Sequence, residues 1–263
     1  LQSTDNEELK ILGRIHTYEQ FLKSYESARV AGFDNINIDI MSGLPYQTTD
    51  KFLDTLYKVI RLRPDHVSAY SLIIEKNTPF YSMYKFDMVK QEAGMKPDIL
   101  PHEDEVYRMY KATQQILGEN GYQQYEISNF AKKGYECRHN IGYWTRTNYL
   151  GLGLGAASLI ENVRCTNTRD VYKYISGSEN IIETTPVERK EQMEEFMFLG
   201  LRMNKGVSRY DFEHEFGIQI EAIYKEQIDE LRREALMDAK AGYIFLTDKG
   251  QDLSNYCMAK FLL

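Results

Sequence analysis

The stretch NINIDIMSGLP, residues 35–45, alternates apolar and polar side chains and then breaks at a glycine and a proline. In a strand, its three isoleucines share one face, and Asn35, Asn37 and Asp39 share the other. A strand of this kind, lying between helices, fits a barrel or half-barrel. We expect the isoleucine face to meet a layer of helices and the polar face to line the interior.

The residues on either side continue an alternation of helices and strands. Thr17 can cap a helix that Gly32 ends, and Thr49 precedes a second helix that stops before Pro64. Further elements are expected as a strand at 66–74, a helix at 103–119 and a short strand at 122–127. A strand–helix–strand repeat of roughly thirty residues is typical of parallel βαβ units. The sequence therefore predicts an α/β fold, with a partial (β/α) barrel over residues 1–180.

The pattern changes after residue 180. Thr185, Pro186 and Glu188 indicate a capped helix that runs through Leu201. A short helix opened by Ser208, a longer one at 218–237, a strand and turn at 242–250 and a last helix follow. Three helices with a small wing predict a helical, winged-helix-like domain over 181–263. Acidic side chains outnumber basic ones there, so we expect a scaffold or contact domain and not a DNA reader.

Composition narrows the class of protein. The formal net charge of −7 over 263 residues argues against nucleic acid as a partner, because neutralising phosphates requires clustered Lys and Arg. No apolar run is long enough to span a bilayer and no secretory signal opens the sequence. We therefore expect a cytoplasmic protein, which leaves transient association with a membrane surface open. The first residues, LQS, read as if cut from a strand, so a fragment that lacks its natural N-terminus is expected.

The three cysteines, Cys137, Cys165 and Cys257, are widely spaced. This spacing gives neither a disulfide framework nor a close pair of metal ligands. We expect inert or weakly reactive thiols in a reducing compartment.

Two stretches raise the question of a ligand. CRHNIGYW, residues 137–144, holds a thiol, an imidazole, a phenol and the only tryptophan, which suits either a packed loop corner or a site for a flat, metal-bearing or aromatic ligand. YLGLGLGAAS, residues 149–158, lacks the glycine spacing of a dinucleotide site and favours a strand that another backbone or a flat ligand approaches closely. We expect the two stretches to form one wall, with His139, Tyr143 and Trp144 at its edge.

Asp39 is the third candidate. It lies late in its strand on the polar face, and ligands of parallel barrels bind at the carboxyl ends of the strands. A carboxylate there can accept hydrogen bonds from both hydroxyls of a ribose. Equally, Asp39 can hydrogen-bond a neighbouring strand or cap a turn.

Several motifs in fixed order resemble one family over nearly the whole sequence. They are LQS, GRIH, NINIDIMSGLP, HVSAYSLIIEKNTP, GYQQYEISNFAKKGYECRHNIGYW and YLGLGLGA. Together they resemble the radical-SAM haem chaperones, HemW, close relatives of the oxygen-independent coproporphyrinogen III oxidases. The resemblance implies a partial radical-SAM (β/α) barrel followed by the C-terminal helical domain of the HemN type.

The resemblance also implies cofactor contacts. Gln2, Arg14 and Asp39 match residues that bind S-adenosylmethionine, and the fork of Arg14 suits the methionine carboxylate while Asp39 suits the ribose. The family's CxxxCxxC motif, whose thiolates hold a [4Fe–4S] cluster, has no counterpart in these residues. The cluster is therefore expected only in the intact protein, and no residue of this chain is assigned a catalytic role.

HNIGYW matches the family motif associated with haem. His139 is the candidate axial ligand of the haem iron, and Tyr143 and Trp144 are expected to contact the macrocycle. Cys137 could ligate as a thiolate instead, although the family motif does not require it. Ala157 stands where relatives often carry histidine, so haem is expected to bind more weakly or with different ligands if that second imidazole normally helps to hold it.

The expected function is a haem chaperone that binds haem and delivers it to recipient haemoproteins. Two alternatives remain at this point. One is a coproporphyrinogen III oxidase of porphyrin biosynthesis, which decarboxylates propionates with a radical derived from S-adenosylmethionine. The other is an interaction module in which CRHNIGYW only packs.

Overall fold

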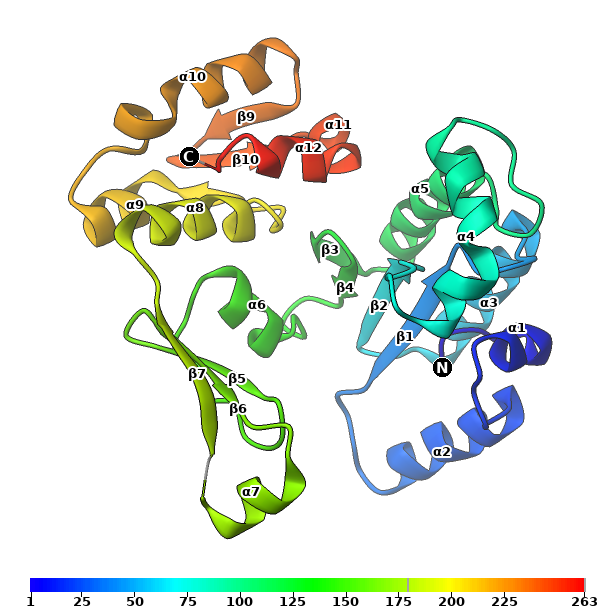
Figure 1. Ribbon diagram of the computed structural model, residues 1–263. Coiled ribbons are helices and arrows are strands. Elements are labelled where there is room, and N and C mark those ends of the chain that lie inside the picture. The colour runs from blue at the N-terminus through cyan, green and yellow to red at the C-terminus, as the bar shows by residue number, and fades with distance from the viewer. Residues whose placement is uncertain (179, 263) are drawn as a thin grey trace. The chain divides into compact units, whose positions relative to one another are not determined.

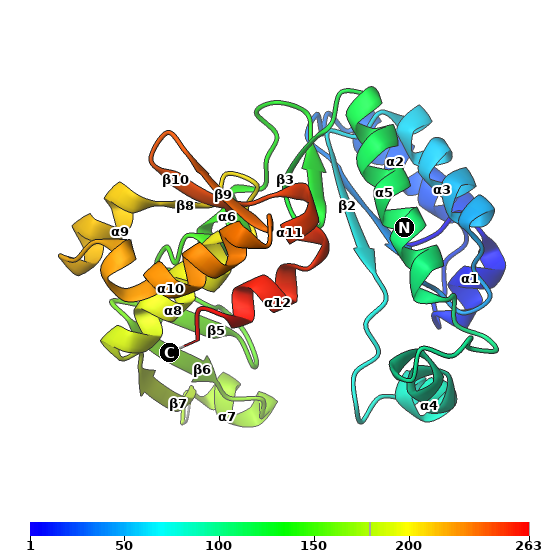
Figure 2. The ribbon, with the colours of Figure 1, turned by 90° about the horizontal axis from the view of Figure 1, so that it is seen from above.

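The computed structural model describes residues 1–178 and 180–262, which form two compact units, Leu1–Glu136 and Cys137–Leu263. Figures 1 and 2 together label the elements of both units. The domain boundary predicted at residue 180 stays a prediction, because a division into compact units does not test where the barrel ends and the helical domain begins.

The first unit contains a four-stranded sheet in the order β1-β2-β4-β3. β1 (Asn37–Ser42) and β2 (His66–Ser71) are parallel, with Asp39 opposite Ser68, and α3 (Thr49–Leu62) connects them along the chain. This is the predicted βαβ unit. β3 (Gln123–Glu126) and β4 (Asn129–Ala131) form a hairpin whose second strand runs antiparallel to β2. No periodicity could reveal β4, because it has only three residues.

The isoleucine face of β1 is buried, as predicted. Ile38 and Ile40 are 1% and 0% exposed and belong to one apolar cluster with side chains of α3 and α5 (Glu103–Glu119). Both helices lie over this face of the sheet (Figures 1 and 2). Each fully buried isoleucine stabilises the fold by about 1.5–3 kcal/mol, which fixes the strand's orientation and leaves Asn37 and Asp39 on the opposite face.

The helices of this unit begin at strong caps. The Thr17 hydroxyl accepts a hydrogen bond from the Gln20 amide, and the Gln20 side chain accepts one from Thr17, so α2 (Tyr18–Val30) opens with a capping box. α1 (Asn6–Ile11) and α4 (Pro79–Glu92) were not predicted. α4 follows Thr78 and starts with proline, but its exposed Met83, Phe86 and Val89 blur the apolar stripe that would have revealed it.

The second unit begins with α6 (Arg138–Trp144) and an antiparallel sheet in the order β5-β6-β7. Its strands are β5 (Ala157–Ile160), β6 (Val163–Asn167) and β7 (Ile181–Pro186), and α7 (Val171–Ser176) lies between the last two in the sequence. The helix start predicted at Thr185 and Pro186 is wrong. Both residues pair with β6, and Pro186 is tolerated because it ends an edge strand. The capping box instead joins Glu188 and Glu191, at the start of α8 (Arg189–Gly200).

The glycine-rich stretch is not the strand that was predicted. Residues 150–156 form irregular turns, and regular pairing starts only at Ala157. The predicted close approach of another backbone does occur, since a Cβ on Gly151 would lie 2.2 Å from the Ala157 carbonyl oxygen. Gly153, at a φ of +103°, adopts a conformation that suits only glycine.

The rest of this unit has the predicted winged-helix outline. α8, α9 (Arg209–Phe216) and α10 (Ile220–Arg233) pack with a sheet in the order β8-β10-β9. The strands are β8 (Val207–Ser208), β9 (Met237–Lys240) and β10 (Tyr243–Leu246), and α11 (Asp248–Asp252) and α12 (Ser254–Ala259) close the chain. As predicted, the Ser208 hydroxyl caps α9. No helix within residues 1–178 and 180–262 has both the length and the apolar character needed to cross a membrane.

Candidate functional site

The first candidate site lies on the polar face of β1. The Gln2 amide donates to the Asp39 carbonyl oxygen over 2.8 Å, and the Met41 amide donates to the Gln2 carbonyl over 2.8 Å. Gln2 therefore pairs with β1 beside Ile40 as a short parallel bridge and is buried. This brings two of the residues predicted for S-adenosylmethionine side by side. Arg14 follows α1 and is exposed.

The phenol of Tyr70 lies near all three residues predicted to bind S-adenosylmethionine. Burial raises the pKa of its phenol, and the charge of Asp39 raises it further. A hydrogen bond with the Gln2 side chain and the charge of Arg14 act in the opposite direction. The phenol therefore lies close enough to Gln2, Arg14 and Asp39 for each of them to affect its pKa. Tyr70 is the β2 residue opposite Met41.

Tyr70 was missed from the sequence although a pattern pointed to it. In HVSAYS, His66, Ser68 and Tyr70 alternate with apolar residues as Asn37 and Asp39 do in β1. In the parallel register, the polar residues of the two strands lie opposite or next to one another.

The Asp39 carboxylate is available for a ligand. Its side chain is partly exposed, and its Oδ1 accepts a hydrogen bond of 2.6 Å from Asn37 Nδ2. A carboxylate has about four lone-pair positions, so most of its acceptor capacity is left for donors such as paired hydroxyls.

The second candidate site is on α6. His139 and Tyr143 are four residues apart, so they share a helix face, and their ring centroids lie 4.7 Å apart in an edge-on contact. Tyr143 makes a second edge-on contact, also of 4.7 Å, with Tyr149. These three residues form what we call the aromatic ladder. Within residues 1–178 and 180–262, no group hydrogen-bonds the exposed His139 imidazole.

Trp144 is not on this ladder. Trp144 lies five positions after His139, which turns the two side chains about 140° apart around the helix. The Arg202 guanidinium lies 4.3 Å from the indole centre, and in the described part of the chain the buried indole N–H has no partner. Trp144 lines a cavity of about 330 Å³ next to Met203 and Tyr243. Of the three residues expected at the edge of one wall, His139 and Tyr143 therefore lie together, whereas Trp144 lies on another face of the helix.

A buried ion pair network anchors α6. The Arg146 side chain, only 3% exposed, donates to Glu195 over 3.0 Å, to Glu215 over 3.0 Å and to Asn162 over 2.9 Å. Glu195 lies on α8 and Glu215 on α9. Arg146 therefore fixes the end of α6 against two helices of the same unit.

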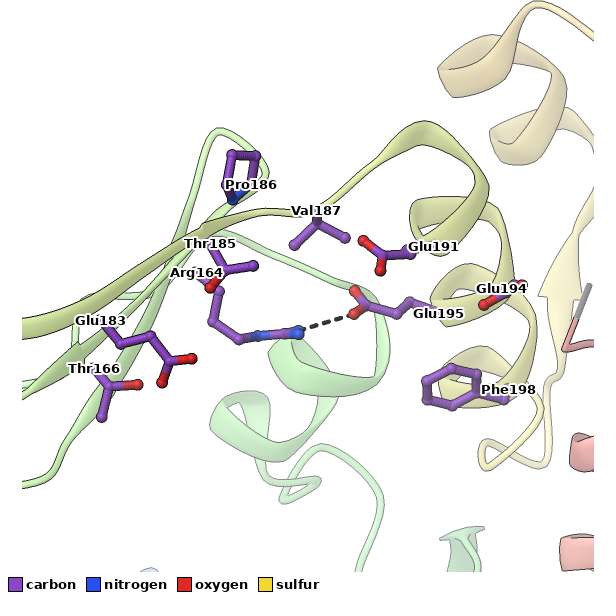
Figure 3. A pocket seen from close by; sticks show the side chains of 10 residues that line it. All are labelled: Arg164, Thr166, Glu183, Thr185, Pro186, Val187, Glu191, Glu194, Glu195 and Phe198. Carbon is purple, nitrogen blue, oxygen red and sulfur yellow. Dashed lines mark hydrogen bonds and ion pairs between the residues drawn. The ribbon is translucent and has the colours of Figure 1, made fainter.

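A second cavity, of about 380 Å³, lies between β6, β7 and α8 (Figure 3). Its lining includes Glu183, Glu191, Glu194 and Glu195, and Arg164 donates to Glu195 over 3.0 Å. None of the residues predicted for a ligand lines it. Its excess of carboxylates disfavours an anionic ligand, and porphyrin propionates are anions.

The cysteines do not gather into a metal site. Cys137 immediately precedes α6, Cys165 lies in β6 and Cys257 in α12. Burial raises the pKa of the Cys257 thiol to about 11. Within the described ranges, no three His, Cys, Asp or Glu residues are grouped as metal ligands.

Comparisons with known proteins agree with the motifs. The family model described as the HemN C-terminal domain matches residues 187–253. The heme chaperone HemW of Lactococcus lactis is 39% identical over 265 residues, covering all of this chain and 68% of that protein. The heme chaperones HemW of Bacillus subtilis and Escherichia coli are 33% and 32% identical, again over the whole chain and over 68% and 67% of their own lengths.

One solved structure shows the same fold. It is coproporphyrinogen III oxidase, HemN, of Escherichia coli, which is described as a radical SAM enzyme. The TM-score is 0.79 at 20% identity, over all of this chain and 62% of that one. The chain thus spans roughly two thirds of the relatives it matches, and at this identity the structural likeness concerns the fold.

Proposed function

This chain belongs to the HemW family of haem chaperones, and from that membership we propose that it binds haem and delivers it to recipient haemoproteins in the cytoplasm. The relatives bear the chaperone name at 32–39% identity, whereas the oxidase is matched at 20%. The chaperone function is therefore preferred to the oxidase.

The exposed imidazole of His139 supports haem binding more than any other observation. Neutral imidazole is a common axial ligand of haem iron, and this one is accessible and free of hydrogen bonds within the described residues. Its edge-on contact with Tyr143 restricts the ring orientation, and Tyr149 extends the flat apolar surface. A haem contact for Trp144 stays a prediction.

The intact protein is also proposed to bind a [4Fe–4S] cluster and S-adenosylmethionine. When bound at such a cluster, S-adenosylmethionine can supply a carbon radical. The three dispersed cysteines do not fit the cluster, so its ligands would come from outside these 263 residues. Asp39, Gln2 and Arg14 do fit S-adenosylmethionine. Asp39 would accept from the ribose hydroxyls, Gln2 holds the strand beside it, and Arg14 would pair with the carboxylate.

The test is a haem titration followed by the Soret band. The wild-type protein should shift the band on binding, and His139→Ala should abolish or move that shift. His214→Ala is the matched control, because His214 is exposed and its ring stacks on that of Tyr210, four residues earlier on α9, at 5.9 Å. Cys137→Ser should leave the spectrum unchanged if imidazole is the ligand. A His139→Ala protein with the wild-type spectrum and affinity would overturn this haem site.

A further inference from the structure

Four polar side chains on one face of the sheet form a continuous series of hydrogen bonds. The Tyr125 hydroxyl lies 2.8 Å from His66 Nε2, and His66 Nδ1 lies 2.6 Å from Asn37 Oδ1. Asn37 Nδ2 lies 2.6 Å from Asp39 Oδ1. The residues come from β1, β2 and β3, and the series ends on the carboxylate proposed to bind the ribose.

The chemistry of the groups fixes the direction of every bond. A carboxylate only accepts, so Asn37 must turn its NH₂ group to Asp39 and its carbonyl oxygen to His66. His66 must then donate from Nδ1, which leaves Nε2 to accept from the Tyr125 hydroxyl. The Ser68 hydroxyl donates to the same Asn37 oxygen over 3.2 Å. Each donor therefore points towards Asp39, and bonds aligned in this way polarise one another.

His66 is suited to act as a neutral link. It is 4% exposed, and burial lowers the pKa of its imidazole, against the smaller opposing effects of Asp39 and Glu136. A neutral imidazole donates from one nitrogen and accepts at the other, as this series requires.

Other contacts also hold these strands together. β1 and β2 pair through their backbones from Asn37 opposite His66 to Ser42 opposite Ser71, and the apolar cluster lies on the other face. The side chains of Asn37 and His66 belong to neither arrangement.

We infer that Asn37 and His66 are positioning residues, which hold the Asp39 carboxylate in the orientation that receives the two ribose hydroxyls of S-adenosylmethionine. The inference rests on the proposed S-adenosylmethionine site. Paired recognition of two hydroxyls requires a fixed carboxylate plane, and a carboxylate that is already fixed loses less side-chain entropy on binding.

The experiment measures binding of S-adenosylhomocysteine, which carries the same ribose and forms no radical, to the intact protein by calorimetry. Asn37→Ala should weaken binding about tenfold, comparable to the loss of one hydrogen bond to a charged group. His66→Ala should also weaken binding. His66→Asn should restore much of the affinity, because the asparagine amide can donate from nearly the position of Nδ1. Asn35→Ala is the control, since Asn35 is exposed on the same side of the chain and outside the series.

A second measurement separates positioning from folding. Nitrogen NMR of labelled histidine should show His66 protonated at Nδ1 in the wild type, and thermal melting should show which variants are folded. Folded Asn37→Ala and His66→Ala proteins that both bind as the wild type does, while Asp39→Ala binds weakly, would overturn the positioning roles and leave the proposed site intact. A wild type that binds no S-adenosylhomocysteine would overturn the proposed site and this inference with it.

Discussion

The two candidate sites are held in different ways. On the sheet, the Asp39 carboxylate is fixed by a neighbouring amide and by the register of two parallel strands. On α6, the His139 imidazole touches one ring and has no hydrogen-bond partner among the described residues. The sheet site is thus prepared for a small polar ligand before it arrives. The exposed imidazole on the helix stays accessible, which suits the reversible haem binding proposed for this chain.

The largest expected effect concerns the anchor of the helix site. Arg146→Met should lower the free energy of unfolding of the second unit by at most about 3–5 kcal/mol, because the buried Glu195 carboxylate keeps only the half-exposed Arg164 as an ion pair partner. Chemical denaturation would measure the loss. Glu215→Gln is the milder comparison, since Glu215 is 41% exposed.

The Arg146 prediction has an internal check. Adding Glu195→Leu to Arg146→Met removes the buried carboxylate that has lost Arg146 and leaves Arg164 half-exposed to solvent, so the double variant should regain part of the lost stability. A double variant less stable than Arg146→Met would contradict the ion pair explanation.

The sheet site should lose ligand binding and keep its fold when its carboxylate is removed. Asp39→Ala should weaken S-adenosylmethionine binding by about 1.5–3 kcal/mol, or roughly ten- to a hundredfold, because charge-assisted hydrogen bonds are lost. Its melting temperature should change little, since Asp39 lies opposite the isoleucine face. Calorimetry would measure the affinity, with exposed Asp34→Ala as the control. Unchanged affinity in a folded Asp39→Ala protein would make Asp39 a structural residue.

The sequence predicted the sheet better than the helix, for a physical reason. The alternation in β1 assigns each side chain to a face, so the buried isoleucines and the polar Asp39 could be separated from sequence alone. Which polar residues meet depends on register, and register also depends on the neighbouring strand. The contacts of Tyr70 with Gln2 and of His66 with Asn37 could therefore be assigned only from the structure.

On the helix, proximity in sequence was misleading. His139, Tyr143 and Trp144 lie within six residues, and a loop could have brought all three rings to one ligand. Once these residues form α6, the rotation per residue separates the indole from the imidazole. The short helix has no buried residue and hence no apolar stripe to reveal it.

A smaller effect should appear as a pH dependence of stability. Burial lowers the pKa of folded His66 below its ordinary value of 6.5, so the unfolded chain takes up a proton first as the pH falls. The stability contributed by neutral His66 is present above pH 6.5 and is lost as the pH falls towards the folded pKa. Denaturation at pH 7.5 and at pH 5.5 should show a smaller decrease for His66→Asn than for the wild type. His214→Asn, at an exposed position, is the control, and equal decreases in His66→Asn and wild type would contradict the assignment.

The smallest expected effect belongs to Trp144. Trp144→Phe keeps an aromatic face for Arg202 and removes the buried indole N–H that has no partner in the described part of the chain, so stability should change by less than about 1 kcal/mol. Haem affinity should fall only modestly, because a phenyl ring keeps part of any stacking area, and the Soret position should not move. Tyr143→Leu, which removes the ring that joins His139 to Tyr149, should weaken haem binding more. If Trp144→Phe weakened haem binding more than Tyr143→Leu, the indole side of α6, and not the aromatic ladder, would be the face that binds haem.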